Sequence, residues 1–231
     1  MLGRPGFIWR THETKHLWLH CETNTYAEGQ VEVLAANQEA AMSGILDLLG
    51  EQTLPRKVHV FAVEDTGRMK TLTGYGFGGL ALPTMNSVCF IFSQTFHAPG
   101  AHELTHVVSQ GSWGLLPLDR SWLNEGFACF AQSEAFAGGR DWDLHASTRQ
   151  LRDSGRLVPL PQLHTNFSAF PATVTYSESG SFVKFLYESY GREKLKQLWK
   201  SRADLPRIYG KSLAELEAEW YQNLDRSKND P

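Results

Sequence analysis

Hydrophobic positions along the chain follow two different spacings, which change near residue 98. The first part contains short apolar runs typical of strands, in which apolar and polar residues alternate weakly over 16–21 and strongly over 57–63. These runs are residues 16–21, 57–63, 80–82 and 87–92. Between the first two runs, apolar residues recur with helical spacing from Tyr26 to Leu49, and Gly50 ends the pattern. The order strand, helix, strand, strand, strand therefore predicts a mixed sheet.

The second part of the chain has helical spacing almost throughout. A first helix is expected from about Ala98 to Gln110, with Pro99 in its first turn and Gly111 after its end. Further helices are expected over residues 121–137, 142–153, 176–190, 194–200 and 212–224, and a proline-rich loop over 158–171. A sheet followed by helices indicates an α+β fold. We expect a single domain over residues 1–231, with a sheet lobe over about 14–97, a helical lobe over about 98–224 and a cleft between them.

The helix expected at the junction carries the pentapeptide His102-Glu103-Leu104-Thr105-His106. Two histidines four residues apart project from the same helix face, so both rings can reach one ion. Glu125 follows on the next expected helix, and two imidazoles with one carboxylate suit zinc and leave a position for water. Glu103 can then take a proton from that water instead of binding the metal. The residues predict one zinc ion held by His102, His106 and Glu125.

Composition and charge exclude several classes of protein. The net charge of −3 gives no excess of positive charge to attract nucleic acid or an anionic membrane surface. No apolar run reaches the roughly 18 residues that a membrane span needs. Three cysteines without paired spacing give no disulfide framework, and the first residues lack the apolar core of a signal peptide. We expect a cytoplasmic protein, or a secreted or periplasmic one whose export signal has been removed; its oligomeric state is left open.

With this motif and spacing, the chain resembles the gluzincin metallopeptidases, whose thermolysin-like group carries His-Glu-x-x-His, eighteen intervening residues and then Glu. Residues 107–124 are those eighteen residues here, and the run Trp122-Leu123-Asn124-Glu125-Gly126-Phe127-Ala128 is similar to the sequence around the third ligand in that group. The likeness is widest to small bacterial peptidase MA-like domains and extends from about Thr14 to Leu224. It implies a zincin fold and a zinc-dependent hydrolase that acts on a peptide or protein substrate.

The resemblance also implies which residues act on that substrate. Glu103 is the implied general base, and afterwards the proton donor to the leaving amine. An edge strand containing Gly78, Gly79, Leu80 and Ala81 would pair with an extended peptide through main-chain hydrogen bonds. A plain tight turn without a ligand is the alternative for these glycines.

A tyrosine is implied opposite the general base. Tyr176 resembles in its placement the tyrosine that stabilises the oxyanion in related aminopeptidases. Packing at the start of a helix is the alternative for Tyr176, and His164, in the expected proline-rich loop, is a second candidate donor.

The chain departs from the gluzincin pattern at two places. No acidic residue stands between Asp65 and Glu103, so the glutamate that holds a free amino terminus in related aminopeptidases is absent. An endopeptidase or a narrow-specificity peptidase is favoured over an aminopeptidase. Cys129 stands one turn after Glu125, where many gluzincins place a carboxylate that orients a histidine; a buried, inert thiol is expected there. Two alternatives stay open: a zinc-bearing binding or scaffold domain with little turnover, and a hydrolase of non-peptide amides or esters.

Overall fold

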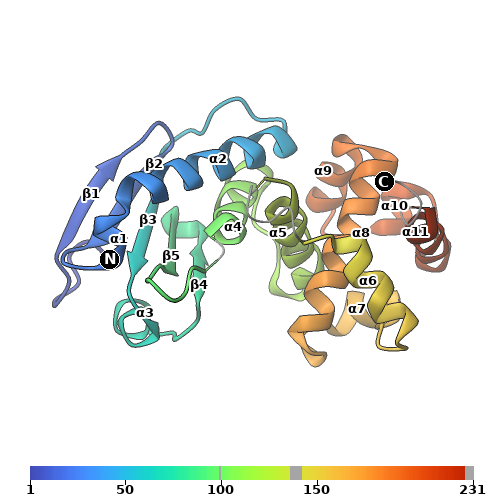
Figure 1. The fold of residues 1–231 in the computed structure, drawn as a ribbon. Coiled ribbons are helices and arrows are strands. Elements are labelled where there is room, and N and C mark those ends of the chain that lie inside the picture. The colour runs from blue at the N-terminus through green and yellow to red at the C-terminus, as the bar shows by residue number, and fades with distance from the viewer. Residues whose placement is uncertain (99, 136–141, 227–231) are drawn as a thin grey trace. The chain divides into compact units, whose positions relative to one another are not determined.

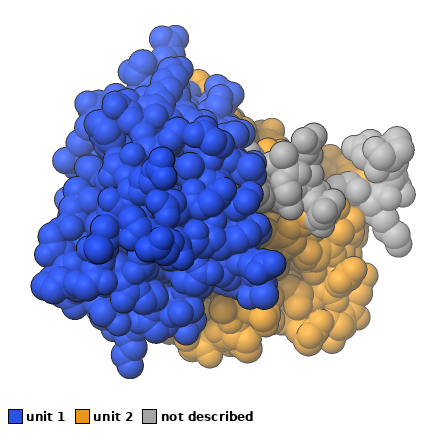
Figure 2. Space-filling view, turned by 60° about the vertical axis from the view of Figure 1, so that its left-hand side comes forward, with its two compact units in different colours: residues 1–112 blue, residues 113–231 orange. Residues whose placement is uncertain are grey.

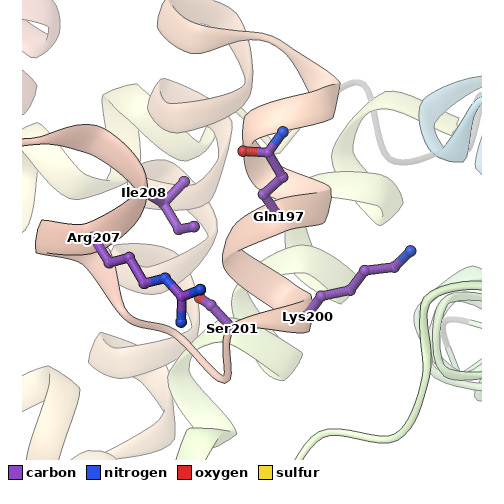
Figure 3. A pocket seen from close by; sticks show the side chains of 5 residues that line it. All are labelled: Gln197, Lys200, Ser201, Arg207 and Ile208. Atoms are coloured by element: carbon purple, nitrogen blue, oxygen red, sulfur yellow. The ribbon is translucent and has the colours of Figure 1, made fainter.

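The chain forms two compact units in the computed structural model. Residues 1–112 make up the first unit and residues 113–231 the second (Figure 2). The structure describes residues 1–98, 100–135 and 142–226. Pro99, expected in the first turn of a helix, and Gly138 and Gly139, expected to end another, lie outside the described residues. The single domain expected from the sequence stays a prediction.

The first unit is built on a five-stranded mixed sheet (Figure 1). Its strands are β1 (Trp9–Glu13), β2 (Leu17–Glu22), β3 (Val58–Val63), β4 (Gly79–Leu82) and β5 (Ser87–Ile91). They lie in the order β1-β2-β3-β5-β4; β2, β3 and β5 are parallel, whereas β1 and β4 pair antiparallel with their neighbours. The mixed sheet expected from the sequence is confirmed. β4 lies at its edge, beside β5.

Helices lie on both faces of this sheet. They are α1 (Tyr26–Gly29), α2 (Val31–Leu49), α3 (Thr66–Thr73) and α4 (Gly100–Trp113), and a 3-10 turn, η1, covers Pro83–Met85. Met69 and Leu72 of α3 share one core cluster with Phe61 and Val63 of β3, and Leu80 of β4 packs against it. Because side chains alternate along a strand, Gly79 faces the opposite side, where α4 lies.

Three expectations about the first unit need correction. The helix expected over Tyr26–Leu49 is interrupted at Gln30, where α1 ends and α2 begins, although Gly50 does end α2 in a left-handed conformation. The motif helix continues through Gly111 to Trp113, because the residue with positive φ is Gly114. The strand β1 and the helix α3 were not expected, since both are short and carry mostly polar side chains.

In the part that the structure describes, the second unit consists of helices and 3-10 turns (Figure 1). These are η2 (Leu118–Arg120), α5 (Ser121–Ala135), α6 (Leu144–Asp153), α7 (Leu160–Asn166), η3 (Phe167–Ala169), α8 (Ala172–Tyr190), α9 (Arg192–Lys200), α10 (Leu205–Tyr209) and α11 (Leu213–Arg226). Large aromatic side chains fill their core, among them Trp122, Phe127, Phe182, Trp199 and Trp220. None of the helices among the described residues is long and apolar enough to cross a membrane.

The prediction of a proline-rich loop over 158–171 is wrong. Most of it is the helix α7 followed by η3, and Pro161 lies in the first turn of α7, where a proline costs no hydrogen bond. The helix α10 was also not expected, and α8 begins at Ala172, one turn before Tyr176. With one mixed sheet and many helices, the α+β composition expected from the sequence is confirmed.

Candidate metal centre

His102 and His106 lie one turn apart on α4, as their spacing predicts, and both are buried. Their Nε2 atoms are 3.1 Å apart, and their rings meet edge to face with centroids 4.8 Å apart. Two nitrogens bound to one tetrahedral zinc at about 2.0–2.1 Å lie roughly 3.4 Å from each other. The pair is therefore close to the separation that one shared zinc ion requires.

Glu125 lies in the first turns of α5. Among the described residues, His102, His106 and Glu125 are the three side chains whose ligand atoms gather closely enough to hold a metal ion, all within 4.8 Å of one another. Two imidazole nitrogens and one carboxylate oxygen form the donor set that zinc takes in catalytic sites, with a fourth position left for water or substrate. The donor chemistry fits the zinc ion expected from the sequence.

Glu103, between the two histidines, lies against the edge strand. A Cβ atom placed on Gly79 would come within 2.5 Å of its Oε1 and 2.8 Å of its Cγ. No side chain larger than hydrogen fits at residue 79 while the carboxylate stays where it is. Gly79, expected on a substrate-pairing strand, and Glu103, expected to be the general base, are therefore neighbours within the first unit.

The edge strand directs its backbone groups alternately toward β5 and toward its open side. The carbonyl oxygen of Gly78 accepts a hydrogen bond from the Ile91 amide at 2.8 Å. In an antiparallel pair the bonded residues alternate, so Leu80 and Leu82 also face β5, whereas Gly79 and Ala81 face the open edge. Of the four residues expected to meet a peptide, only Gly79 and Ala81 therefore present main-chain donors and acceptors to that edge.

The two candidate oxyanion donors lie on helices of the second unit. Tyr176 lies in the second turn of α8 and is half-buried, with its ring centroid 5.8 Å from that of Phe167. His164 lies on α7, not in a loop; its Nε2 is 3.4 Å from the Ala203 carbonyl oxygen, and burial lowers its pKa. The His164 ring therefore has a backbone partner, and both Tyr176 and His164 stay candidates.

Cys129 is fully buried on α5, as expected, and forms no disulfide. Burial, and then the charge of Glu125, raises the pKa of its thiol well above the usual value. The neutral thiol packs against α8, where a Cβ atom on Gly180 would lie 2.9 Å from its Cβ. It does not supply the charge that a carboxylate would give to the second coordination shell.

One residue of this region was missed in the sequence. Gln38 of α2 is buried, and a Cβ atom placed on Gly100, the first residue of α4, would lie 2.6 Å from its Oε1. The Gln38 amide thus abuts the start of the helix that carries both histidines. A signal was present, because Gln38 is a polar residue at a buried position of an otherwise apolar helical face.

Comparisons with known proteins give a family and similar folds. The family model described as the peptidase MA superfamily matches residues 52–225. Among solved structures, the M1 zinc metallopeptidase from Deinococcus radiodurans is similar with a TM-score of 0.55 and 15% identity, over 93% of this chain and 51% of that one. An aminopeptidase N family protein from Idiomarina loihiensis is similar with a TM-score of 0.51 and 14% identity, over 85% and 41%.

These likenesses to solved structures concern the fold, and the chain spans about half the length of the structures it matches, or less. No curated protein matches the sequence. The family model covers about three quarters of the chain, and its range includes the pentapeptide, Glu125 and Tyr176. The chain therefore belongs to the peptidase MA superfamily, as its resemblance to the gluzincins predicted.

Proposed function

We propose that this chain is a zinc-dependent peptidase in which His102, His106 and Glu125 hold one zinc ion. The observation that carries the proposal is the gathering of these three ligand atoms within 4.8 Å, with Glu103 between the two histidines in sequence. Membership in the peptidase MA superfamily supports it. When bound, zinc would polarise a substrate carbonyl and lower the pKa of a water molecule to about 7.

Glu103 supplies the proton transfers of the reaction. Its carboxylate accepts a proton from the attacking water and passes it to the leaving amine nitrogen, so one group serves both halves of the hydrolysis. Gly79 lets this carboxylate lie directly against the edge strand, where a paired peptide backbone would run. Tyr176 donates a hydrogen bond to the oxyanion that forms on the attacked carbonyl.

The substrate is held as an additional strand. Gly79 and Ala81 offer their main-chain groups to an extended peptide, which pairs at the open side of β4. Main-chain hydrogen bonds do not depend on the identity of the side chains, so this pairing suits a peptidase that accepts several sequences. Gly78 and Leu80 contribute indirectly, since they bind β4 to β5.

We propose cleavage within a peptide chain over cleavage at its amino terminus. No carboxylate stands between Asp65 and Glu103 to hold a free amine beside the edge strand. The similar structures point the other way, because one is an aminopeptidase N family protein and another is an M1 zinc metallopeptidase bound to L-tryptophan. Peptides with a blocked amino terminus separate the two: an endopeptidase cleaves them, and an aminopeptidase does not.

One observation favours a second candidate function, a zinc-bearing binding domain with little turnover. The neutral thiol of Cys129 replaces the carboxylate that orients a metal-bound histidine in many gluzincins. Loss of such a partner typically costs about 10–100-fold in metal affinity or activity. Peptide binding without chelator-sensitive cleavage of peptides or small esters would favour this candidate.

The decisive experiment replaces Glu103 with Gln. Zinc content, measured by atomic absorption, should stay at one ion per chain, while hydrolysis of casein or quenched fluorescent peptides should fall by at least about 10²–10⁴-fold. Glu32→Gln, at an exposed position of α2, is the matched control and should behave like the unchanged protein. Turnover retained in Glu103→Gln would remove Glu103 from its proposed role.

A further inference from the structure

Three aromatic side chains are exposed beside the start of the edge strand. Tyr75, Phe77 and Phe96 leave 56%, 59% and 50% of their surface accessible. A single exposed aromatic residue is ordinary, but neighbouring ones are a common mark of a binding surface. We call these three residues the aromatic rim.

The aromatic rim is held in place by its own backbone. The rings of Tyr75 and Phe77 stack with centroids 5.7 Å apart, and the Tyr75 amide donates to Thr73 Oγ1 at 3.1 Å. The Phe96 amide donates to Ser93 Oγ at 3.1 Å, and its carbonyl accepts from the Ser93 amide. A surface that is ordered before binding loses less conformational entropy when a ligand is bound.

The aromatic rim is continuous with the residues proposed to bind a peptide. A Cβ atom placed on Gly78 would lie 3.4 Å from the Phe96 ring, so this ring packs directly beside the strand. Phe77 precedes Gly78, and Gly79 is the residue that both faces the open edge and abuts Glu103. A peptide paired with Gly79 and Ala81 therefore passes the aromatic rim close to the bond undergoing hydrolysis.

The charge of this segment fits an uncharged ligand. Between Asp65 and Glu103 there is no acidic residue, and the nearest cation in sequence to the aromatic rim is Lys70, on α3. Side chains of an extended peptide alternate between two sides, so one of every two can reach the rings. Aromatic and large aliphatic side chains gain most from contact with rings of this kind.

We infer that the aromatic rim is the surface that sets substrate preference, by receiving a large apolar or aromatic side chain of the bound peptide. The inference rests on the proposed function, since it takes the ligand to be a peptide on the edge strand. It makes Tyr75, Phe77 and Phe96 specificity-determining residues. The preference is for peptides with a Phe, Tyr or Leu beside the cleaved bond, over the same peptides with Ala or Asp there.

The test measures peptide binding without turnover. Zinc-loaded full-length Glu103→Gln protein is titrated into fluorescein-labelled Gly/Ser peptides that carry one Phe or, in the matched peptide, one Ala, and fluorescence anisotropy gives each Kd. The Phe peptide should bind about five- to tenfold more tightly than the Ala peptide. Adding Phe77→Ala or Phe96→Ala should abolish this difference, whereas Val33→Ala, equally exposed on α2, should preserve it. Circular dichroism checks that each variant is folded, and two independent rim variants guard against the misfolding of one.

Equal affinity for the two peptides, or equal behaviour of Phe77→Ala, Phe96→Ala and Val33→Ala, would overturn the inference. Cleavage assays on the unchanged zinc-loaded protein keep it separate from the proposed function. Chelator-sensitive cleavage without preference for Phe over Ala would overturn the inference and leave the peptidase standing. The opposite result is a protein that cleaves no peptide but binds the Phe peptide more tightly, with a preference that requires Phe77 and Phe96. That result would contradict the proposed peptidase function and support the aromatic rim as a peptide-binding surface.

Discussion

Gly79 of β4 and Glu103 of α4 approach so closely that a methyl group does not fit between them. The Cβ of an alanine at residue 79 would lie 2.5 Å from Oε1, 2.8 Å from Cγ and 2.9 Å from Cδ of the glutamate. All three atoms belong to a flexible side chain, which can rotate away. The glycine therefore determines where the carboxylate lies more than whether the protein folds.

Gly79→Ala should separate activity from stability. The Glu103 carboxylate must move by about 1 Å or more, and a displacement of that size costs about 10²-fold in rate when a catalytic group depends on its position. Stability should change by less than about 1 kcal/mol, because the glutamate side chain adapts. Peptide hydrolysis and urea unfolding measure the two effects, and zinc content should stay at one ion per chain.

Gly76→Ala is the control for this prediction. The nearest atom to a Cβ at residue 76 is the Thr66 carbonyl oxygen at 3.9 Å, an ordinary contact. Activity in Gly76→Ala should stay within about twofold of the unchanged protein. An equal loss of activity in Gly76→Ala and Gly79→Ala would mean that both glycines are needed for the backbone conformation of the loop. The short distance between Gly79 and Glu103 would then not be the cause.

The His-Glu-x-x-His spacing predicted the neighbourhood of the site because it depends on a single helix. Residues four apart meet on any helix, so the contact between His102 and His106 follows from local geometry alone. The approach of Gly79 to Glu103 depends on which strand lies beside α4, and the place of Gln38 depends on how α2 crosses the sheet. Local sequence spacing determines neither relationship, so neither could be predicted from the sequence.

The difference between local spacing and long-range packing also explains which elements of the fold were predicted. Strands β3 and β5 are short, mostly apolar runs, and the apolar residues of the helix α2 recur with helical spacing, so these patterns predicted all three elements. The helix α3 has eight mostly polar residues, and what marks its start is Asp65, whose Oδ1 accepts the Arg68 amide at 2.8 Å. Capping begins such a helix where hydrophobic spacing gives no signal. Asp204 marks the start of α10 in the same way.

A close helix packing beside the third ligand gives a second prediction. A Cβ atom on Gly126 would lie 2.7 Å from the Ser179 carbonyl oxygen and 2.8 Å from Val183 Cγ2. A backbone carbonyl cannot rotate away, so α5 and α8 would have to separate. We expect Gly126→Ala to destabilise the protein by about 1–3 kcal/mol, measured by urea unfolding.

Gly111→Ala should change stability in the opposite direction. Gly111 also lies within a helix, but nothing stands within 4 Å of a Cβ there. Alanine loses less conformational freedom than glycine on forming a helix, so stability should rise by about 0.5–1 kcal/mol. If both substitutions shifted stability in the same direction, close packing at Gly126 would not be the cause.

Glu178 of α8 should make stability fall as the pH rises. Its side chain is fully buried; burial, and then the charge of Glu217, raises its pKa from 4.5 to about 8, although the Val158 amide donates to its Oε2. Between these two pH values the folded chain binds more protons at this group than the unfolded chain. Its stabilising effect is therefore complete below about pH 4.5 and is lost as the pH rises through about 8.

Glu178→Gln should remove this dependence. Glutamine is neutral at every pH and can still accept the Val158 hydrogen bond. Urea unfolding at several pH values gives the free energy of unfolding of both proteins. The advantage of the variant in this free energy should grow by roughly 2–4 kcal/mol between pH 4.5 and pH 8.5. Glu193→Gln, at an exposed position of α9, is the control and should keep the original slope. A slope unaltered in Glu178→Gln would place the proton on another group.

Zinc should stabilise the folded chain through the two histidines of α4. A ligand that binds only the folded state at 100 times its Kd adds about 2.7 kcal/mol, so zinc should raise Tm and a chelator should reverse the rise. His106→Ala removes one of the paired Nε2 atoms and should abolish the zinc-dependent shift. His12→Ala, a histidine on β1 whose side chain lies 3.6 Å from Glu32, should keep it. A zinc-dependent shift that persisted in His106→Ala would show that the ion binds elsewhere, and scanning calorimetry with and without zinc decides between these outcomes.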